Sequence, residues 1–463
     1  MFTLRYKNFK KARLNILKKV FTVVMVLTFV LGILFISGVN AKEAKEKLVW
    51  ISWSSGTEAK MNEKLVEVYM SHHPKVEINL ITVPWQAYTQ KVYSMVVGGS
   101  QLDIAFVDSW AAYGWYKKGM MAPVDSILEE HPELKDQSQY LWTIFDWCTY
   151  PDGHIYMIPY SGGHLPLLWV NLDMFDEAGL DYPRFHPAYP WTWQEFLTAA
   201  KRLTKREGNK VTQWGFYLPY VDPLYTIWPF VLGNGGPVFN NFSEKARTWV
   251  EPTECLLDDP KSIEGLQFLY DLLHKYKVAT GTLIYGEGPE LWTGQKAAME
   301  LNGCWWLNSR RDTPFRYDIA PLPVKKGVKS PGIMGVNGNC ILSSSKHKEA
   351  ARDFIAFFFT DEAEPILYGE PLGMMTSPRW HTYRPNGPFF SKSGLPPNIQ
   401  LYTRYTSTST ALNMVVQTFW SPHSREIIDI WNSEMEKIYT GKAASAEEVC
   451  KEIVRRVNPL LKK

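Results

Sequence analysis

The chain has 463 residues, which is too long for one small core and predicts two or three domain-sized units. Its formal charge of +3 belongs to the N-terminus, because residues 42–463 hold 43 basic and 47 acidic residues, a charge of −4. This balance excludes a basic nucleic-acid-binding surface, and we expect no nucleic-acid partner. Aromatic residues make up 14% of the chain, including 19 tryptophans, more than packing usually requires.

The N-terminus carries the clearest compartment signal. Seven basic and no acidic residues precede an apolar run, Val20–Val39, which ends in Val39-Asn40-Ala41. This order is typical of an export signal, with cleavage expected after Ala41. The run is also long enough to cross a bilayer, so an uncleaved membrane anchor stays an alternative. Either way, we expect a periplasmic or extracellular protein.

The first unit alternates strands with helices. The pattern predicts strands at Leu48–Trp53, Val76–Val83 and Asp103–Val107, with a helix ending at His72-His73-Pro74 and another at Trp85–Val97. Such alternation indicates a parallel sheet.

A second unit begins near Gly162. Thr192 and Glu195 form a capping box for a helix predicted at Trp193–Arg206. The other expected elements are a strand at Leu165–Val170, an aromatic connector at Tyr217–Phe230, a helix at Lys261–Tyr276, strands at Ala297–Leu301 and Ile333–Leu342, and helices at His347–Phe359, Arg425–Tyr439 and Ser445–Val457.

The five cysteines are odd in number and scattered, without metal-ligand spacing. We interpret them as small buried residues, although one disulfide stays possible. His72-His73 is interpreted as exposed surface. We therefore expect no metal and no cofactor.

Several short blocks, in one order, resemble the family 1 extracellular solute-binding proteins of ABC sugar importers (maltose-binding-protein-like). The blocks are VWISWSSG, VPWQAY, GGSQLDIAFVDSW, IYMIPYSGG, WVNLDMFDEAGL, TWQEFLTAAKRLTKREG, WPFVLGNGG, GQKAAMELNGCWW, YDIAPLPV and FTDEAEPILYGEPLG. The resemblance implies an α/β, two-lobed periplasmic-binding-protein fold of the type II kind. Each lobe would be a mostly parallel sheet flanked by helices, and three hinge crossings would join the lobes.

The resemblance also implies the domain boundaries. Residues 1–41 would be the export signal, residues 42–162 with 338–371 the first lobe, and residues 163–337 with 372–463 the second. The crossings are expected near Ser161-Gly162, Met334–Asn337 and Pro371–Met375, where Gly or Pro residues gather.

Candidate ligand-binding residues lie where the first unit's strands end. In parallel sheets, ligands bind at the carboxyl ends of strands, where this chain has Asp108 and Trp110. Trp85 and Tyr88 share one helix face and could cover the cleft or pack in the core. The resemblance adds Trp53, Ser54, Ser55, His164, Tyr225, Trp228, Trp305 and Trp306, and Asn337 at the second crossing completes the set.

Structural roles compete with some of these assignments. Asp108 could cap the following helix, and His164 could be an ordinary buried histidine. Of Trp305 and Trp306, one could stack on a sugar while the other packs, and Cys304 stands where the family usually has proline.

These features predict a monomeric carbohydrate-binding protein that delivers a mono- or oligosaccharide to the permease of an ABC transporter. A secreted carbohydrate-active hydrolase is the first alternative, since two carboxylates would suffice for its chemistry. A membrane-anchored sugar-sensing or interaction domain is the second. No G-x-S-x-G or H-E-x-x-H motif is present, so we expect no enzyme and no catalytic residue.

Overall fold

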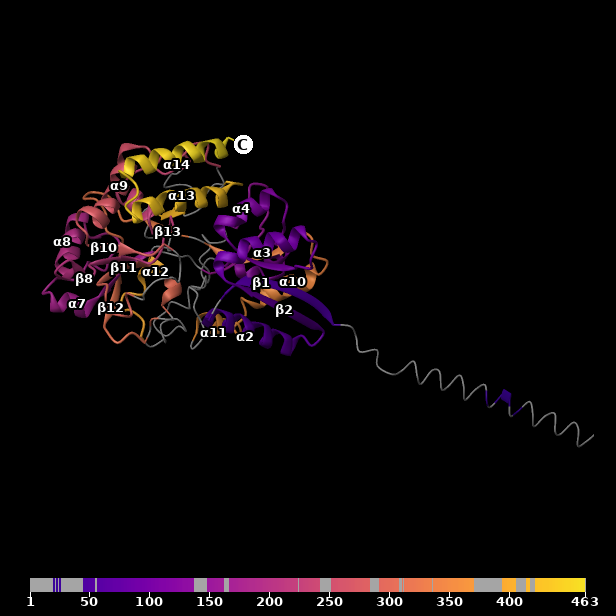
Figure 1. Cartoon of the computed structure of the whole chain (residues 1–463). Coiled ribbons are helices and arrows are strands. Elements are labelled where there is room, and N and C mark those ends of the chain that lie inside the picture. The colour runs from indigo at the N-terminus through magenta and orange to yellow at the C-terminus, as the bar shows by residue number, and fades with distance from the viewer. Residues whose placement is uncertain are drawn as a thin grey trace, which may run out of the picture.

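A computed structural model gives the fold as two large mixed sheets, each with its own helices, and two small two-stranded sheets (Figure 1). It describes residues 45–54, 56–136, 148–161, 166–223, 225–241, 251–283, 291–307, 310, 312–334, 336–369, 394–404, 414–416 and 421–462, with residues 20, 22, 23 and 25. Most of the apolar run Val20–Val39 therefore lies outside the described residues. Within the described part, no helix has both the length and the apolar character needed to cross a membrane.

The first sheet has the strand order β2-β1-β3-β14-β4, and β5 also pairs with β14. Strands β1, β2 and β3 are parallel, as the sequence predicts, whereas β14 runs antiparallel to its neighbours. The strands are β1 (Glu46–Trp53), β2 (Val76–Val83), β3 (Ile104–Asp108), β4 (Met121–Ala122), β5 (Ile158–Ser161) and β14 (Asn337–Leu342). The helices are α2 (Gly56–His72), α3 (Trp85–Val97), α4 (Ser109–Lys117), α5 (Asp125–Glu130), η1 (Pro132–Lys135), α10 (Lys348–Phe357) and α11 (Glu364–Tyr368).

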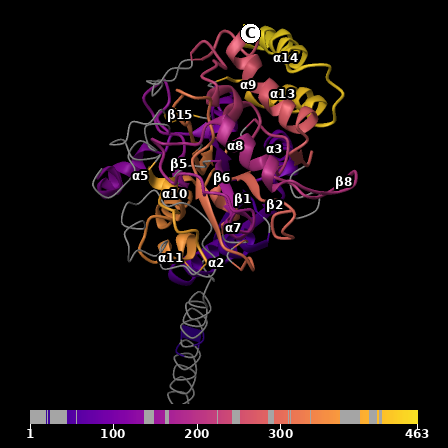
Figure 2. The ribbon, with the colours of Figure 1, turned by 90° about the vertical axis from the view of Figure 1, so that its left-hand side faces the viewer.

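Strand β14 brings a distant part of the chain back into this sheet. Asn337 pairs with Asp108 of β3 and with Ser161 of β5. A Cβ atom on Gly338 would collide with the carbonyl oxygen of Ile158, so only glycine fits there. In Figure 2, the orange helices α10 and α11, which follow β14, lie with α2 in the first lobe. The first lobe is therefore built from two separated segments.

The second sheet has the order β10-β9-β11-β6-β12 and is also mixed. Its strands are β6 (Leu167–Asn171), β9 (Phe216–Leu218), β10 (Ala279–Gly281), β11 (Met299–Asn302) and β12 (Tyr317–Ala320). The larger helices beside it are α7 (Leu172–Glu177), α8 (Trp193–Leu203), α9 (Pro260–Tyr270), α13 (Ser424–Tyr439) and α14 (Ala446–Leu461). Smaller elements are β7 (Lys205–Glu207), β8 (Lys210–Gln213), η2 (Trp228–Leu232), η3 (Asp271–Lys275), η4 (Cys304–Trp306), β13 (Gly332–Met334), α12 (Leu401–Arg404) and β15 (Met414–Val416).

Among the elements that differ from the sequence prediction are the following three. The helix predicted to reach Arg206 ends at Leu203, because the next residues form the β7–β8 hairpin, whose turn uses Gly208 at φ 58°. The connector Tyr217–Phe230 contains strand β9 and the start of η2. The single strand predicted at Ile333–Leu342 is divided into β13 and β14, which pair with different strands.

Other local predictions are confirmed. The capping box is present, since the Thr192 hydroxyl accepts from the Glu195 amide and the Glu195 carboxylate accepts from the Thr192 amide. All five cysteines are buried, as the sequence predicts.

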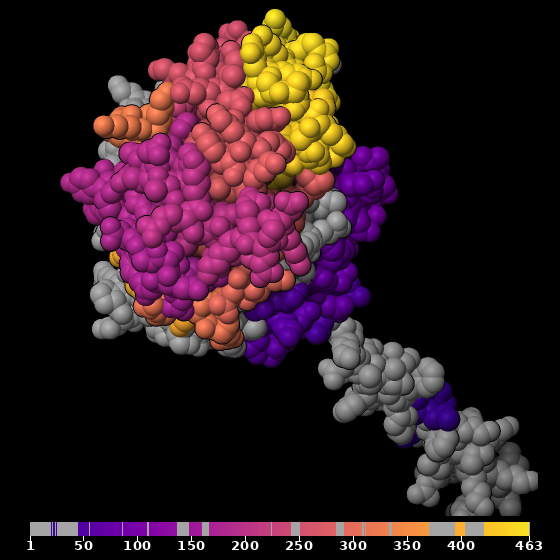
Figure 3. All heavy atoms as spheres, turned by 60° about the vertical axis from the view of Figure 1, so that its left-hand side comes forward, coloured from indigo at the N-terminus to yellow at the C-terminus, as the bar shows by residue number. Residues whose placement is uncertain are grey.

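The two lobes touch where the C-terminal helices meet the first lobe. Figure 3 shows the yellow C-terminal helices of the second lobe against the purple part of the first. The contact is made by α13 and α4, which lie side by side in Figure 1.

Candidate functional site

Helices α3 and α4 form one wall of a groove between the lobes. Helix α4 begins directly after β3, and its N-cap is Asp108, whose Oδ1 accepts a hydrogen bond of 2.8 Å from the Ala111 amide. Asp108 is only 6% exposed, yet it lines the groove. The capping role weighed for this residue is therefore present, and it coexists with a position on the groove wall.

The opposite wall comes from the second lobe. The loop at Tyr220, Val221 and Asp222, which follows β9, contributes side chains, and so does the first half of α13. Between the two walls lies a cavity of about 380 Å³. Its lining residues are Trp85, Thr89, Tyr93, Asp108, Ala111, Gly114, Trp115 and Lys118 on one side, and Tyr220, Val221, Asp222, Leu283, Pro422, His423, Ser424, Arg425, Glu426, Ile428 and Asn432 on the other.

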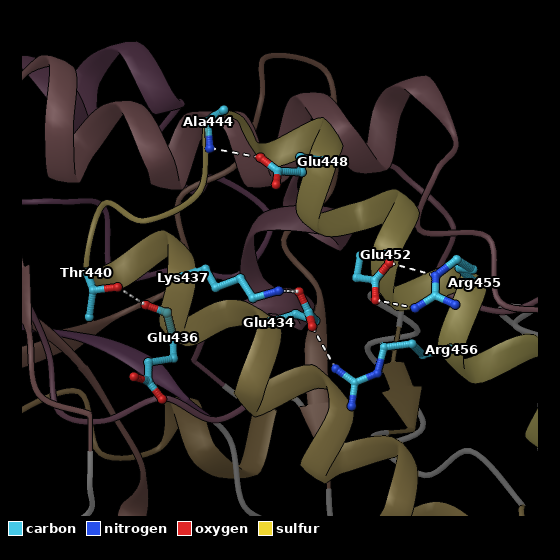
Figure 4. A network of polar contacts seen from close by, with 9 residues as sticks. All are labelled: Glu434, Glu436, Lys437, Thr440, Ala444, Glu448, Glu452, Arg455 and Arg456. Atoms are coloured by element: carbon cyan, nitrogen blue, oxygen red, sulfur yellow. Dashed lines mark hydrogen bonds and ion pairs between the residues drawn. The ribbon is translucent and has the colours of Figure 1, made fainter.

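Helix α13 is firmly attached to the second lobe (Figure 4). Its residues Ile427, Trp431 and Met435 are fully buried in that lobe's core. The buried Glu434 carboxylate accepts hydrogen bonds from Arg456 of α14, at 2.6 Å, and from Lys437, at 2.5 Å. The groove wall that α13 presents therefore moves with the second lobe.

A clasp of three contacts joins α4 to the second lobe. The Tyr113 hydroxyl and the Lys117 ammonium both donate to Oε1 of Glu251, at 2.6 and 3.0 Å. On the groove side, a Cβ on Gly114 would lie 3.2 Å from the Pro422 carbonyl oxygen, so the backbone of α4 lies very close to the backbone before α13. Burial, followed by the neighbouring Glu251 carboxylate, raises the pKa of Tyr113, which stays a neutral donor.

The predicted residues Trp53, Trp85 and Tyr88 form one aromatic cluster but have different exposures. The Trp85 ring is 37% exposed and lines the groove. Trp53 packs edge-on behind it, with ring centroids 4.8 Å apart. Tyr88 is 2% exposed and donates its hydroxyl to the carbonyl oxygens of Phe106 and Ile51. Tyr88 therefore belongs to the core, which corrects its assignment as a ligand contact.

The other candidates near the strand ends are only partly described. Ser54 is 6% exposed, and its Oγ has no hydrogen-bond partner among the described residues. Trp110 lies in the first turn of α4, but its side chain is outside the described part, and Ser55 and His164 are outside it altogether. Asn337 is 7% exposed and sits opposite Asp108 in the sheet.

Tyr225 and Trp228 lie in the second lobe's core, contrary to the prediction. Both are fully buried. The Trp228 ring packs edge-on against Trp431 of α13, with centroids 5.8 Å apart, and the Tyr225 ring packs in the same way against Tyr220, at 4.8 Å. Tyr220 lines the groove in their place. The sequence signal for Tyr220 was the aromatic connector itself, but nothing in its pattern marks which ring faces outward.

Trp305 and Trp306 occupy different environments at the lobe boundary. Both are half-buried, and Trp305 packs against the cores of both lobes. The Trp305 ring lies so close to Gly303 that a Cβ there would collide with it. The face of Trp306 is covered by the guanidinium of Arg310, 4.7 Å from the ring centroid. Of the two indoles, Trp305 therefore has the position between the lobes.

A buried ion pair supports this turn. Glu300 of β11 is fully buried and pairs with Arg310, which is 3% exposed. The Asn302 amide donates to Oε1 of Glu300 at 3.0 Å, and the Gly303 amide donates to Oδ1 of Asn302 at 2.9 Å. Removing one partner of such a pair leaves a buried charge, so the pair holds the turn firmly in place.

Comparison with protein families and known proteins gives a consistent picture. Residues 53–365 match the model of the family described as bacterial extracellular solute-binding protein. The chain is 28% identical over 246 residues to an arabinooligosaccharide-binding protein of Halalkalibacterium halodurans, covering 50% of this chain and 49% of the relative. It is 26% identical over 274 residues to the sn-glycerol-3-phosphate-binding periplasmic protein UgpB of Brucella abortus, covering 58% and 57%. The matches thus span about half the length of these curated relatives.

Solved structures share the fold over almost the whole chain. The substrate-binding protein Lmo0181 of Listeria monocytogenes, solved in complex with cycloalternan, superposes with a TM-score of 0.75 at 23% identity. The superposition covers 90% of this chain and 99% of that structure. Maltose-bound MalE3 of T. maritima gives a TM-score of 0.70 at 18% identity. The two-lobed α/β fold predicted from sequence is confirmed.

The clasp predicts a measurable effect of Glu251→Gln. This change keeps the side-chain shape but removes the charge that Lys117 and Tyr113 share, so the lobes hold each other less strongly. Because an exposed ion pair contributes roughly 0.2–1 kcal/mol, ligand affinity should fall about 1.4- to fivefold in calorimetry. Glu254→Gln, an exposed neighbour, is the matched control. Equal affinities in wild type and Glu251→Gln would contradict the clasp.

A second prediction concerns Glu58, in the first turn of α2. Burial raises the pKa of this half-buried carboxyl from 4.5 to about 8. Between these pH values the native protein keeps a proton that the unfolded chain has lost, so stability should fall as pH rises through this window. Denaturant unfolding at pH 4.5 and pH 8 should show this fall, and Glu58→Gln should reduce it. Glu63→Gln, on the exposed face of α2, should leave this fall in stability unchanged. If Glu58→Gln also leaves it unchanged, Glu58 is not the group responsible.

Proposed function

Because this chain belongs to the bacterial extracellular solute-binding proteins, we propose that it captures a carbohydrate between its lobes and delivers it to the permease of an ABC importer. The family is one of binding proteins, so the hydrolase alternative is set aside. The carbohydrate and the permease are the proposed partners, and the protein acts as a monomer.

The observation that carries this proposal is a groove with walls from both lobes. A ligand that touches α3 and α4 on one side and Tyr220 and α13 on the other binds the closed arrangement better than an open one. Closure then follows from binding, and the permease can distinguish the loaded protein by its shape. The hinge would lie at the three crossings near Ser161-Gly162, Met334–Asn337 and Pro371–Met375, between the lobe segments 42–162 with 338–371 and 163–337 with 372–463.

The chemistry of the groove suits a neutral, hydroxyl-rich ligand. The exposed ring of Trp85 offers a flat face for sugar C–H groups. The carboxylates in the lining outnumber the permanently charged basic side chains by three to two. They are Asp108, Asp222 and Glu426 on the acidic side, and Lys118 and Arg425 on the basic side. This lining favours a carbohydrate over a doubly charged phosphate ester.

The family is extracellular, so the chain is exported. We propose that the export signal is removed near Ala41 and that the alternative, a retained anchor at Val20–Val39, does not hold. The mass of the exported protein distinguishes the two.

Thermal unfolding with a ligand panel tests the function. A ligand that binds only the native state at 100 times its Kd stabilises the protein by roughly 2.7 kcal/mol, which raises Tm by several degrees. The panel holds arabinose, arabinobiose, arabinotriose, glucose, maltose, maltotriose and sn-glycerol 3-phosphate. We expect at least one sugar to raise Tm. A rise with sn-glycerol 3-phosphate alone, or with none of the seven, would refute the carbohydrate proposal.

Substitution of Trp85 tests the site. Trp85→Ala removes an exposed ring, so the fold should persist while affinity for the sugar found in the panel falls roughly five- to tenfold, as expected for one stacking contact of about 1 kcal/mol. Titration calorimetry measures the fall, and circular dichroism checks the fold. Tyr189→Ala, which removes an exposed ring outside the groove, is the control. Wild-type affinity in Trp85→Ala would place the sugar elsewhere.

A further inference from the structure

The groove is elongated, because each of its three helices lines it with one complete face. Helix α3 contributes Trp85, Thr89 and Tyr93, each four residues from the next. Residues four apart lie on the same face of a helix, one turn further along. At 1.5 Å per residue, the distance from Trp85 to Tyr93 along the helix axis is about 12 Å.

The other two helices repeat this pattern. Helix α4 contributes Ala111, Gly114 with Trp115, and then Lys118 just after its last turn. Helix α13 contributes Arg425, Ile428 and Asn432, about 10 Å from first to last, while the neighbouring face of the helix lies in the core. In Figure 1, α3, α4 and α13 lie together at the contact between the lobes.

The two ends of the groove differ in character. At the inner end, Trp85 and Asp108 begin α3 and α4, beside the carboxyl ends of the parallel strands. At the outer end, the Lys118 ammonium donates to the Tyr93 hydroxyl at 3.2 Å and lies 4.9 Å from the centre of that ring. This pair joins the last turns of α3 to the end of α4, so both helices border the groove there as well as at the inner end.

We propose that this groove takes an oligosaccharide along its length, with one unit at Trp85 and Asp108 and a further unit at Tyr93 and Lys118. This inference rests on the proposed function and narrows its ligand to a chain of more than one sugar. A single hexose ring is much shorter than the groove and would leave the outer end unused. The Tyr93 ring supplies an apolar face there, and the Lys118 ammonium supplies a donor for sugar hydroxyls.

Under this proposal, Tyr93 and Lys118 determine how much the affinity rises with each added sugar unit. Lys118 is exposed and Tyr93 half-buried, so both can meet a ligand that enters from solvent. Among the described residues, the structure gives Lys118 no carboxylate partner, so its ammonium is available to a sugar hydroxyl.

Titration calorimetry with sugars of increasing length tests this inference. The probes are arabinose, arabinobiose and arabinotriose, and glucose, maltose and maltotriose, applied to wild type, Lys118→Met and Tyr93→Leu. In the series that binds, wild-type affinity should rise from one unit to three. The ratio of trisaccharide to monosaccharide affinity should fall about fivefold in Lys118→Met, which keeps the apolar stem but removes the charged donor.

Each outcome has a definite meaning. If wild type binds one and three sugar units with equal affinity, the inference is overturned, although sugar binding stands. The same holds if the trisaccharide-to-monosaccharide ratio of Lys118→Met and of a folded Tyr93→Leu equals the wild-type ratio. If Tyr93→Leu does not fold, the exposed Lys118→Met variant decides alone. If none of the six sugars binds wild type, the proposed function fails and this inference fails with it. Tyr189→Ala should keep the wild-type ratio.

Discussion

The structure of the groove depends on the placement of one carboxylate. Asp108 ends β3, lies opposite Asn337 of the returning strand β14, and caps α4 through a hydrogen bond of 2.8 Å to the Ala111 amide. An N-cap of this kind contributes about 1 kcal/mol and fixes where the helix begins. Because α4 begins there, its groove face and its clasp residues Tyr113 and Lys117 are all directed at the second lobe. One residue therefore couples the first sheet to the groove.

The helices around the groove divide their surfaces between stability and binding. On α13, Ile427, Trp431 and Met435 are buried in the core, while Arg425, Ile428 and Asn432 line the groove. The buried Glu434, held by Arg456 and Lys437, fixes this helix to α14 (Figure 4). Such attachment lets each groove wall move as one body with its lobe, so that lobe motion changes the width of the groove without reshaping either wall.

More of the fold than of the candidate site could be predicted from the sequence. The strand–helix alternation of the first unit, the T-x-x-E capping box and the burial of the cysteines follow from local pattern, and all appear in the structure. The antiparallel entry of β14 could not be predicted from periodicity, because pairing across more than 170 residues leaves no local trace.

The errors at the site concern aromatic residues. The helix face shared with Trp85 indicated Tyr88, and the family resemblance indicated Tyr225 and Trp228, yet all three are buried. An aromatic ring serves a core as well as a cleft, and sequence does not report which side of a helix another lobe will cover. The groove residues of α13 could not be identified from the sequence, because charged side chains such as Arg425 at the start of a helix are typical of any exposed surface.

The central claim is that a sugar binds between α4 and the loop at Tyr220–Asp222, in contact with both lobes. The most direct test is a crystal structure of the protein with the panel sugar that raises Tm most. Our account predicts electron density for that sugar in the groove, with Trp85 on one side and Tyr220 on the other. Density for the sugar at a place that touches only one lobe, or away from α4, would contradict it.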